Sequence, residues 1–293
     1  MKKDFFYSKS SSALEFDKVM KKLAEFASTE QAKAYFNELL PLYEAPCVQT
    51  LMAQCLAAQT LLSYKPSFPM QAPGEEIKAS LLKTEKDISL SAEQILEIGR
   101  LLSTAGRLRA YYEDKKFSTP ELDMFFENLY TDEGLARQIE RSFLPSGAVA
   151  DEASAELAKI RKSIVRAGQA VKEELSRYIK SPDVSAHLQE PIVTLRSDRY
   201  VIPVKADNRG DITGLLHDTS QTGNTLFIEP LFVVEQNNKI KKLELEEQNE
   251  ILRILSELSK AIGIAARQML RSFRTLTALD IIFAKAKYAA AYG

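Results

Sequence analysis

Two long stretches of the sequence repeat like amphipathic helices, and they enclose a short stretch that alternates like β-strands. The first, residues 151–180, contains neither proline nor a strand pattern. Its apolar residues recur every three or four positions, close to the seam of a coiled coil: Leu157, Ile160, Ile164, Ala167, Val171, Leu175 and Tyr178. So narrow a stripe is typical of a helix with one partner, and such a helix would be roughly 45 Å long.

The enclosed stretch, residues 191–230, holds the only convincing strand patterns. Four strands are predicted, over residues 192–196, 200–205, 212–217 and 225–228. Ser197, Asp198 and Arg199 are expected to form a short hairpin connection between the first two. Because Pro203 has no N–H, we expect the second strand to be an edge or to bulge there.

The second helical stretch begins directly at Leu231. One side of it carries Val233, Asn237, Ile240, Leu243, Ile251, Ile254, Leu258 and Ile262. Because the β module between the two stretches is small, its ends should lie close together, and the helices can run antiparallel and cover each other's stripes. The order of the chain therefore predicts an arm of two helices with a β tip.

Residues before this arm repeat like shorter helices. Starts are predicted at Ala13, Ser28 (as a cap), Pro46, Ser91, Pro120 and Asp132, and a proline-rich loop over 63–75. The chain is thus expected to be mainly α. Its predicted parts are a helical core (1–148), an outgoing helix (149–190), a β module (191–230), a returning helix (231–265) and a helix returning to the core (266–293).

The composition excludes several classes of protein. Lys and Arg number 39 and Asp and Glu 40, so net charge predicts neither a nucleic-acid nor a membrane partner. The amino terminus lacks the apolar region of a signal peptide. No stretch approaches the roughly 18 uncharged apolar residues of a membrane span. Cys47 and Cys55 match no zinc or redox spacing, and so few cysteines indicate a reducing cytoplasm.

The stretch HDTSQTGNTLFIEP, from His217 to Pro230, raises the question of catalysis. A Ser-His-Asp catalyst needs a carboxylate that orients the imidazole. His217 and Asp218 are neighbours in a predicted strand, however, and so point to opposite faces. No G-x-S-x-G elbow occurs in the sequence. The composition of residues 218–224 is that of a turn, and no catalytic residue is predicted.

No cofactor or metal site is predicted either. The phosphate-loop pattern and G-x-G-x-x-G are both absent. His187 falls between the first long helix and the strands, and no cysteine lies near either histidine, so zinc is not expected. The Glu- and Lys-rich run of residues 239–250 is either a solvated face with i,i+4 pairs or a polar interruption that sets register or admits a partner.

Charge is uneven along the predicted arm. Residues 159–180 carry seven Lys and Arg against two Glu, residues 260–287 six against one Asp, and residues 191–230 four against five acids. A row of cations on a helix attracts phosphate backbones, although the flank of a solvated coiled coil has the same composition. The candidate nucleic-acid-binding residues are Arg161, Lys162 and Arg166 on the helix and Arg196, Arg199, Lys205 and Arg209 at the tip.

Four segments carry a family resemblance: ALEFDKVMKKLAEFASTE, PIVTLRSDRYVIPVKADNRGDITGLLHDTSQTGNTLFIEP, NNKIKKLELEEQNEILRILSELS and LDIIFAKAKYA. They resemble the amino-terminal half of the bacterial MutS type 2 family, the Smr-bearing paralogues of the mismatch-repair protein MutS. The resemblance runs from about Leu14 to Tyr288. Its most specific part is the segment 191–230.

The resemblance implies a helical core and a two-helix lever with a β clamp at its tip, HDTSQTGNTLFIEP being the last turn and strand of the clamp. It also implies that an ATPase domain follows the position of Tyr288 and that an Smr nuclease domain follows that. This chain is then a non-catalytic fragment, with ATP, Mg²⁺ and the main dimer contacts in the domains it lacks. Phe227-Ile-Glu229 spells the mismatch wedge of MutS, but the type 2 family lacks the wedge domain, so mismatch reading is not expected.

Two functions remain as alternatives. The resemblance implies binding of branched DNA, with suppression of recombination, or of collided ribosomes. The fragment would then grip branched or duplex DNA, or ribosomal RNA, by its backbone. Alternatively, it is a mechanical and protein-interaction arm that couples the ATPase to contacts between clamps or with a ribosomal protein. A cytoplasmic location, a homodimer of the full-length protein and no membrane partner are expected in either case.

Overall fold

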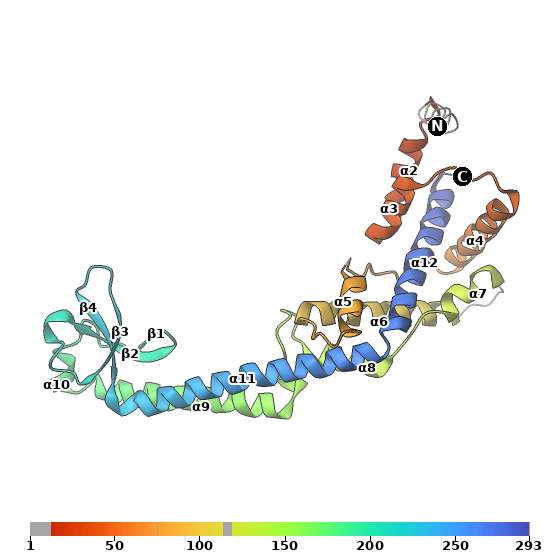
Figure 1. The fold of residues 1–293 in the computed structure, drawn as a ribbon. Coiled ribbons are helices and arrows are strands. Elements are labelled where there is room, and N and C mark those ends of the chain that lie inside the picture. Colours follow the sequence, from red (N-terminus) through yellow and green to blue (C-terminus); the bar gives the residue numbers. More distant parts are fainter. Residues whose placement is uncertain (1–12, 75, 114–118, 293) are drawn as a thin grey trace. The chain divides into compact units, whose positions relative to one another are not determined.

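Helices dominate the structure, a computed structural model that describes residues 13–74, 76–113 and 119–292 (Figure 1). About 66% of the chain is helical, and its strands form a small four-stranded antiparallel sheet. The mainly α fold predicted from the sequence is therefore confirmed. The chain divides into two compact units, the first made of residues 1–149 and 255–293 and the second of residues 150–254. No helix of the described residues is long and apolar enough to cross a membrane.

The first unit is built around its last helix, α12. Its helices are α2 (Phe16–Ala24), α3 (Glu30–Glu38), α4 (Ala45–Tyr64), α5 (Ile77–Thr84), α6 (Ala92–Glu113), α7 (Pro120–Glu127), α8 (Glu133–Ser142) and α12 (Ala266–Tyr292). Helix α12 contacts each of α2 to α7. At its centre Phe283 stacks on Phe68, with ring centroids 3.7 Å apart. A helix surrounded in this way buries apolar residues on several of its faces, and Met269, Phe273, Leu276, Leu279, Ile282 and Phe283 of α12 are all buried.

Most helix starts in this unit follow from local sequence. Ser91 and Gln94 form a reciprocal capping box before α6, because each side chain bonds the other residue's N–H. Asp132 caps α8 through the N–H of Leu135. Helix α5 was not predicted: it has eight residues and no side-chain cap, so its local signal is weak. The predicted loop over 63–75 starts two residues later than expected, because α4 continues through Tyr64. From residue 65 to residue 74 the described chain has no helix or strand.

The cap of α3 corrects the sequence prediction. Thr29, not Ser28, is the cap, and its hydroxyl accepts from the N–H of Ala32. The Ser28 N–H instead donates to Asp280 of α12, a residue 252 positions away. The buried carboxylate of Asp280 also accepts from the N–H of Thr29, at 2.7 Å, and from its hydroxyl, at 2.8 Å. This contact fixes the start of α3 on α12.

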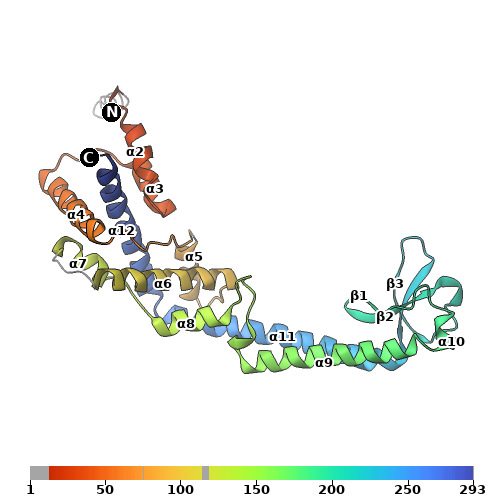
Figure 2. The same ribbon diagram turned by 180° about the vertical axis from the view of Figure 1, so that it is seen from behind.

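The second unit contains two helices that run side by side in opposite directions. They are α9 (Ala155–Tyr178) and α11 (Leu231–Ile264), whose residues up to Ile254 belong to this unit. Three contacts follow their antiparallel course: Ser154 to Glu250, Arg161 to Glu247, and the ring of Tyr178 to that of Phe232. Figure 2 shows the same pairing from behind. All seven positions of the predicted α9 stripe are buried or half-buried.

The sheet lies between these helices in the sequence, and its strands are β1 (Thr194–Arg196), β2 (Arg199–Lys205), β3 (Gly214–Thr219) and β4 (Thr225–Pro230). Their order in the sheet is β1-β2-β4-β3, and every pairing is antiparallel. All four predicted strands exist, with ends shifted by one or two residues. Two short helical elements, α10 (Pro182–Ser185) and η2 (Ala206–Asn208), come before and between the strands, and a third, η1 (Asp151–Ala153), precedes α9 and contacts it.

The expectation for Pro203 was wrong. Strand β2 is an inner strand, and its pairing with β4 continues through Pro203 opposite Phe227 without a shift. On the other side of β2, however, β1 pairs only as far as Val201, and residues 187–189 pair from Pro203 onward. The proline therefore stands where one neighbour gives way to another, a place where the ladder needs no N–H from it.

A bulge in β3 decides where His217 lies. Leu216 pairs with Ile228 and Asp218 with Phe227, so His217 is the extra residue. Near the start of β3, Gly214 lies so close to β4 that a Cβ there would be 2.3 Å from the carbonyl oxygen of Glu229. Only glycine fits this approach. The sheet covers a core with α9 and α11 that includes Val171, Leu175, Ile202, Ile228, Val233 and Ile240.

Candidate functional site

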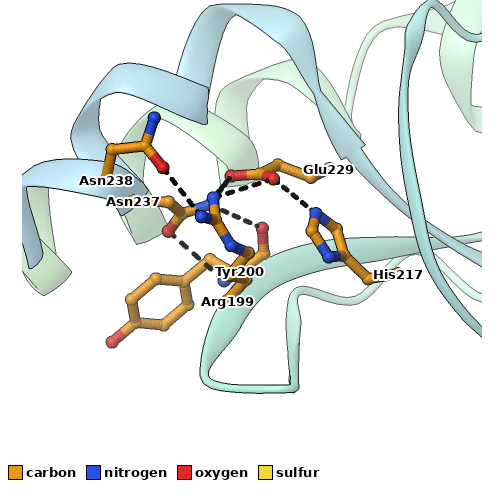
Figure 3. Close-up of polar contacts among 6 residues, drawn as sticks. All are labelled: Arg199, Tyr200, His217, Glu229, Asn237 and Asn238. Atoms are coloured by element: carbon orange, nitrogen blue, oxygen red, sulfur yellow. Dashed lines mark hydrogen bonds and ion pairs between the residues drawn. The ribbon is translucent and has the colours of Figure 1, made fainter. Parts of the chain in front are cut away.

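A buried carboxylate, Glu229, is the centre of the polar contacts in the second unit (Figure 3). It stands near the end of β4, just before α11, and none of its side chain is exposed. Arg199 of β2 donates to both of its oxygens, at 2.8 and 3.1 Å. The Nε2 of His217, in β3, lies 2.5 Å from its Oε2. Because a carboxylate oxygen accepts, this ring nitrogen carries the hydrogen.

Two asparagines of α11 complete the cluster. The buried Asn237 donates to Glu229 at 2.7 Å and to the carbonyl of Tyr200 at 3.1 Å, and it accepts from the N–H of Tyr200. Asn238 accepts from the second guanidinium nitrogen of Arg199 at 2.7 Å. One carboxylate thus links β2, β3 and β4 to the first turns of α11. A charge removed from water needs such partners, because an unpaired one would cost several kcal/mol.

The geometry answers the question raised by His217 and Asp218. His217 bonds Glu229, whereas Asp218 pairs with Arg196 at 3.4 Å, so the neighbouring aspartate does not orient the imidazole. Ser220 lies in the turn after β3 and bonds the backbone of Thr225. The predicted turn is present, although Asp218 itself belongs to the strand. The His187 Nδ1 lies 3.2 Å from Asp211.

The sequence prediction missed Glu229 and Asn237 as partners. The sequence prediction considered Glu229 only as the last residue of Phe227-Ile-Glu229. The structure places that triplet in β4. There the guanidinium of Arg196 lies 4.3 Å from the ring centroid of Phe227. One signal was available: Asn237 occupies an apolar position in the stripe of α11, and a polar residue there needs a buried partner.

Two of the seven candidate cations are held inside the second unit. Arg199 is the partner of Glu229 just described. Arg161, only 26% exposed, pairs with Asp151 at 2.6 Å and with Glu247 of α11 at 2.7 Å. These carboxylates raise the pKa of Arg161 against the opposing effect of its burial. Both arginines therefore contribute to packing within the unit.

Lys162 and Arg166 lie in a row of cations on the outward side of α9. Both side chains are exposed, and neither has an ion-pair partner among the described residues. Lys159 stands three residues before Lys162, and Arg177 stands eleven residues, about three turns, after Arg166. The four cations therefore share one face over about 27 Å, interrupted by Glu173. We call Lys159, Lys162, Arg166 and Arg177 the α9 row.

The three remaining candidates lie on the sheet or beside it, and all are exposed. Arg196 lies over Phe227, as above, and pairs with Asp218. Lys205 donates to the carbonyl of Ala186. The side chain of Arg209, after η2, has no hydrogen-bond or ion-pair partner among the described residues. The structure thus separates these three from the α9 row and does not gather the seven candidates into one site.

A second carboxylate, Glu250, joins the start of α9 to α11. Ser154, the cap of α9, accepts from the N–H groups of Glu156 and Leu157 and donates to Glu250 at 2.5 Å. Two nitrogens of Arg253 donate to Glu250, each at 2.7 Å. Chiefly because of Arg253, and also because of Ser154, the pKa of Glu250 is lowered from its usual 4.5 to about 2.

This shift makes a testable contribution to stability. A lowered folded-state pKa adds stability that is complete above pH 4.5 and is lost as the pH falls toward 2. Glu250→Gln should therefore lower the free energy of unfolding at pH 7 by about 1 kcal/mol, and the difference from wild type should shrink between pH 4.5 and 2. Urea unfolding at several pH values measures it. Glu246→Gln, 46% exposed and 3.9 Å from Lys242, is the control. A difference that does not depend on pH would contradict the assignment.

The described residues hold no group of three or more His, Cys, Asp or Glu side chains placed to bind a metal ion. They do supply two different surfaces in the second unit. One is the outward face of α9 with its row of cations. The other is the sheet, whose polar cluster fixes it on α11.

Comparison with known proteins identifies the family. No family model matches the chain. It is 36% identical over 275 residues to a protein named Endonuclease MutS2 from Pelotomaculum thermopropionicum, a match that covers 94% of this chain and 35% of that protein. Proteins with the same name from Carboxydothermus hydrogenoformans and Clostridium botulinum are 33% and 37% identical, each over 94% of this chain and 35% of theirs.

The match covers nearly all of this chain but only part of each relative. At least 33% identity over 94% of the chain extends through both compact units. On the side of the relatives, the chain spans about a third of their length. The chain therefore belongs to the family of the proteins named Endonuclease MutS2 and corresponds to about 35% of such a protein.

Proposed function

We propose that this chain is the part of a MutS2 protein that holds nucleic acid by its backbone and performs no catalysis itself. In this proposal the paired helices α9 and α11 are a lever and the sheet is the clamp that it carries. The relatives are named as endonucleases, so their substrate is nucleic acid. Nuclease and ATPase chemistry, with its ATP and Mg²⁺, is assigned to the rest of the full-length protein, as is its dimerisation.

The observation that carries the proposal is the α9 row. Its cations lie on the side of α9 opposite the buried stripe, so the packing of the two helices does not require them. Three of them lack an ion-pair partner among the described residues, and Lys159, 75% exposed, lies 3.6 Å from Glu156. Exposed cations in line along a helix bind phosphates without reading base sequence. The shared ligand is a phosphate backbone, in branched or duplex DNA or in ribosomal RNA.

The row is a local feature rather than a consequence of net charge. Residues 150–254 carry 15 Lys and Arg against 17 Asp and Glu. The acids include Glu244, Glu246, Glu247 and Glu250, all on α11. Attraction for a polyanion is therefore expected mainly on one face of α9, and the acids of α11 should repel it. Binding should depend on which cations are removed and not only on how many.

Replacing the row tests this directly. With Lys159, Lys162, Arg166 and Arg177 all changed to Ala, affinity for labelled four-way-junction and linear duplex DNA at 50 mM salt should fall about a hundredfold or more, because four phosphate contacts are lost. Fluorescence anisotropy measures the affinity, and purified ribosomes form a third arm of the experiment. All four positions are on a solvated helix face, so the variant should fold, which circular dichroism checks.

The matched control removes four exposed cations from the first unit. Changing Lys78, Lys83, Lys86 and Arg137 to Ala alters net charge by the same amount. Affinity should then change little. Equal losses in the two variants would mean that only net charge matters, which would contradict a grip by α9.

The sheet favours a second candidate function, a protein-interaction arm that couples the rest of the protein to a partner. Leu195, Leu215 and Leu216 are each at least 44% exposed on the sheet, and exposed apolar side chains are typical of protein interfaces. The partner would be the sheet of a second subunit or a ribosomal protein, docking against a sheet edge. Changing Leu195 and Leu215 to Ser should then abolish ribosome binding while DNA binding persists, and the α9 row variant should do the reverse.

A further inference from the structure

Helix α4 has a composition that its surroundings in the structure do not account for. Its 20 residues, Ala45–Tyr64, include no charged side chain. Its polar residues are all uncharged, and a helix so low in polarity is more often enclosed by protein than left in water: Gln49, Thr50, Gln54, Gln59, Thr60 and Ser63. Only Ala57, Ala58 and Leu61 of α4 are buried, where it packs on α12 and α7. On its other side Met52 and Leu56 are 66% and 64% exposed.

A groove of about 380 Å³ runs beside this exposed side of α4. Its walls come from α2, α4, α12 and the segment between α3 and α4, and they include Met20, Leu40, Leu42, Met52 and Cys55. Leu40 is 62% exposed and Leu42 47%. A surface this apolar marks a contact site rather than a solvated face.

One charged residue, Lys285 of α12, lines the groove. Its ammonium lies 5.6 Å from the ring centroid of Tyr35, and no carboxylate pairs with it among the described residues. Burial lowers the pKa of Lys285. A half-buried cation in apolar surroundings is costly unless an acid pairs with it. The complement of this groove should therefore be apolar and carry one carboxylate.

The size and charge of the surface select among three occupants. A small amphiphile would fill the groove but leave Leu56 and Tyr43, 64% and 81% exposed, uncovered. A second copy would bring the same patch to the contact, so that each Lys285 would meet a groove whose lining has no Asp or Glu. The third occupant is another segment of the full-length protein. An uncharged helix face suits a permanent interface of this kind, and about 65% of each full-length relative lies outside the matched region.

We propose that the groove and the exposed side of α4 seat a segment from the two thirds of a MutS2 protein that this chain does not span, and that this segment places an Asp or Glu against Lys285. The inference rests on membership of the family and not on nucleic-acid binding. Its failure would leave the proposed grip by α9 untouched. Equally, a negative DNA-binding result would leave this seat intact.

The two cysteines of the sequence provide the test. Cys55 lines the groove, and Cys47 lies at the start of α4. The probe is the part of the Pelotomaculum relative that this chain does not match, expressed separately and added in excess. Alkylation of Cys55, followed by mass spectrometry, should slow about tenfold or more, and amide exchange in α4 should slow with it. Lys285→Ala should weaken the association about tenfold.

A matched pair of variants locates the contact. Met52→Asp should abolish protection of Cys55, and Met124→Asp on α7 should not, although the two methionines are 66% and 65% exposed. Unchanged alkylation with saturating probe would overturn the proposal. So would a concentration-dependent dimer of this chain alone, by light scattering, in which Cys55 is already protected, because a second copy would then be the occupant.

Discussion

Glu229→Ala is expected to lower the free energy of unfolding of the second unit by about 3–5 kcal/mol. The substitution removes the acceptor of Arg199, His217 and Asn237 at once, and leaves a guanidinium and a buried amide without their partner. Strands β2, β3 and β4 then lose their common tie to α11. The measurement is urea unfolding by circular dichroism, with hydrogen exchange and mass spectrometry to place the effect in residues 199–240.

Two further variants separate this role from a general effect of charge. Glu229→Gln keeps one oxygen acceptor and the shape of the side chain. It should therefore lower the free energy of unfolding by less than the alanine variant does. Glu246→Ala, on the exposed side of α11 with its carboxylate 3.9 Å from Lys242, should cost less than 1 kcal/mol. If Glu229→Ala costs no more than Glu246→Ala, the cluster does not hold the sheet.

In the first unit, Asp280→Ala is expected to lower the free energy of unfolding by about 3 kcal/mol. It leaves the N–H groups of Ser28 and Thr29 and the hydroxyl of Thr29 without their acceptor. Two of these donors are in buried contacts, where an unsatisfied group costs most. Hydrogen exchange should show α3 opening first, because Thr29 is its cap.

The control for Asp280 is an acid of the same unit that ends a helix in solvent. Glu113 is 69% exposed and pairs with Arg109 at 3.3 Å, so Glu113→Ala should change stability by less than 1 kcal/mol. Asp280→Asn keeps one oxygen acceptor, so its loss of stability should lie between those of Glu113→Ala and Asp280→Ala. An Asp280→Ala protein as stable as the Glu113→Ala protein would show that α3 does not depend on this contact.

The long elements could be predicted because their pattern repeats over many residues. The stripe of α9 from Leu157 to Tyr178 sets both the existence of the helix and the side that it buries. The hairpin connection could be predicted for a local reason, because a short polar segment separates two runs of strand-forming residues. In the structure Ser197 and Asp198 adopt positive φ, as a two-residue turn of this kind demands, and Arg199 already belongs to β2. Short helix α5 has no such repetition, and it was missed.

The polar contacts could not be predicted because their partners are far apart in sequence. Glu229 meets Arg199 across 30 residues, and Thr29 meets Asp280 across 251. Neither partner changes the local pattern of its own segment. The same limit applies to the candidate cations. Composition alone could not separate Arg161, held by Asp151 and Glu247, from Lys162 beside it. Only packing distinguishes a cation that holds the fold from one that faces solvent.

The salt dependence of DNA binding by this chain tests the central proposal most directly. Log affinity for a labelled four-way junction should fall linearly with log salt concentration, at a slope of about −3.6 if the α9 row neutralises four phosphates. Between 50 and 200 mM salt the affinity would then drop roughly 150-fold. In the row variant the slope should be close to zero. No binding by the wild-type chain at 50 mM salt, or an equal slope in the row variant, would contradict a grip on the phosphate backbone by α9.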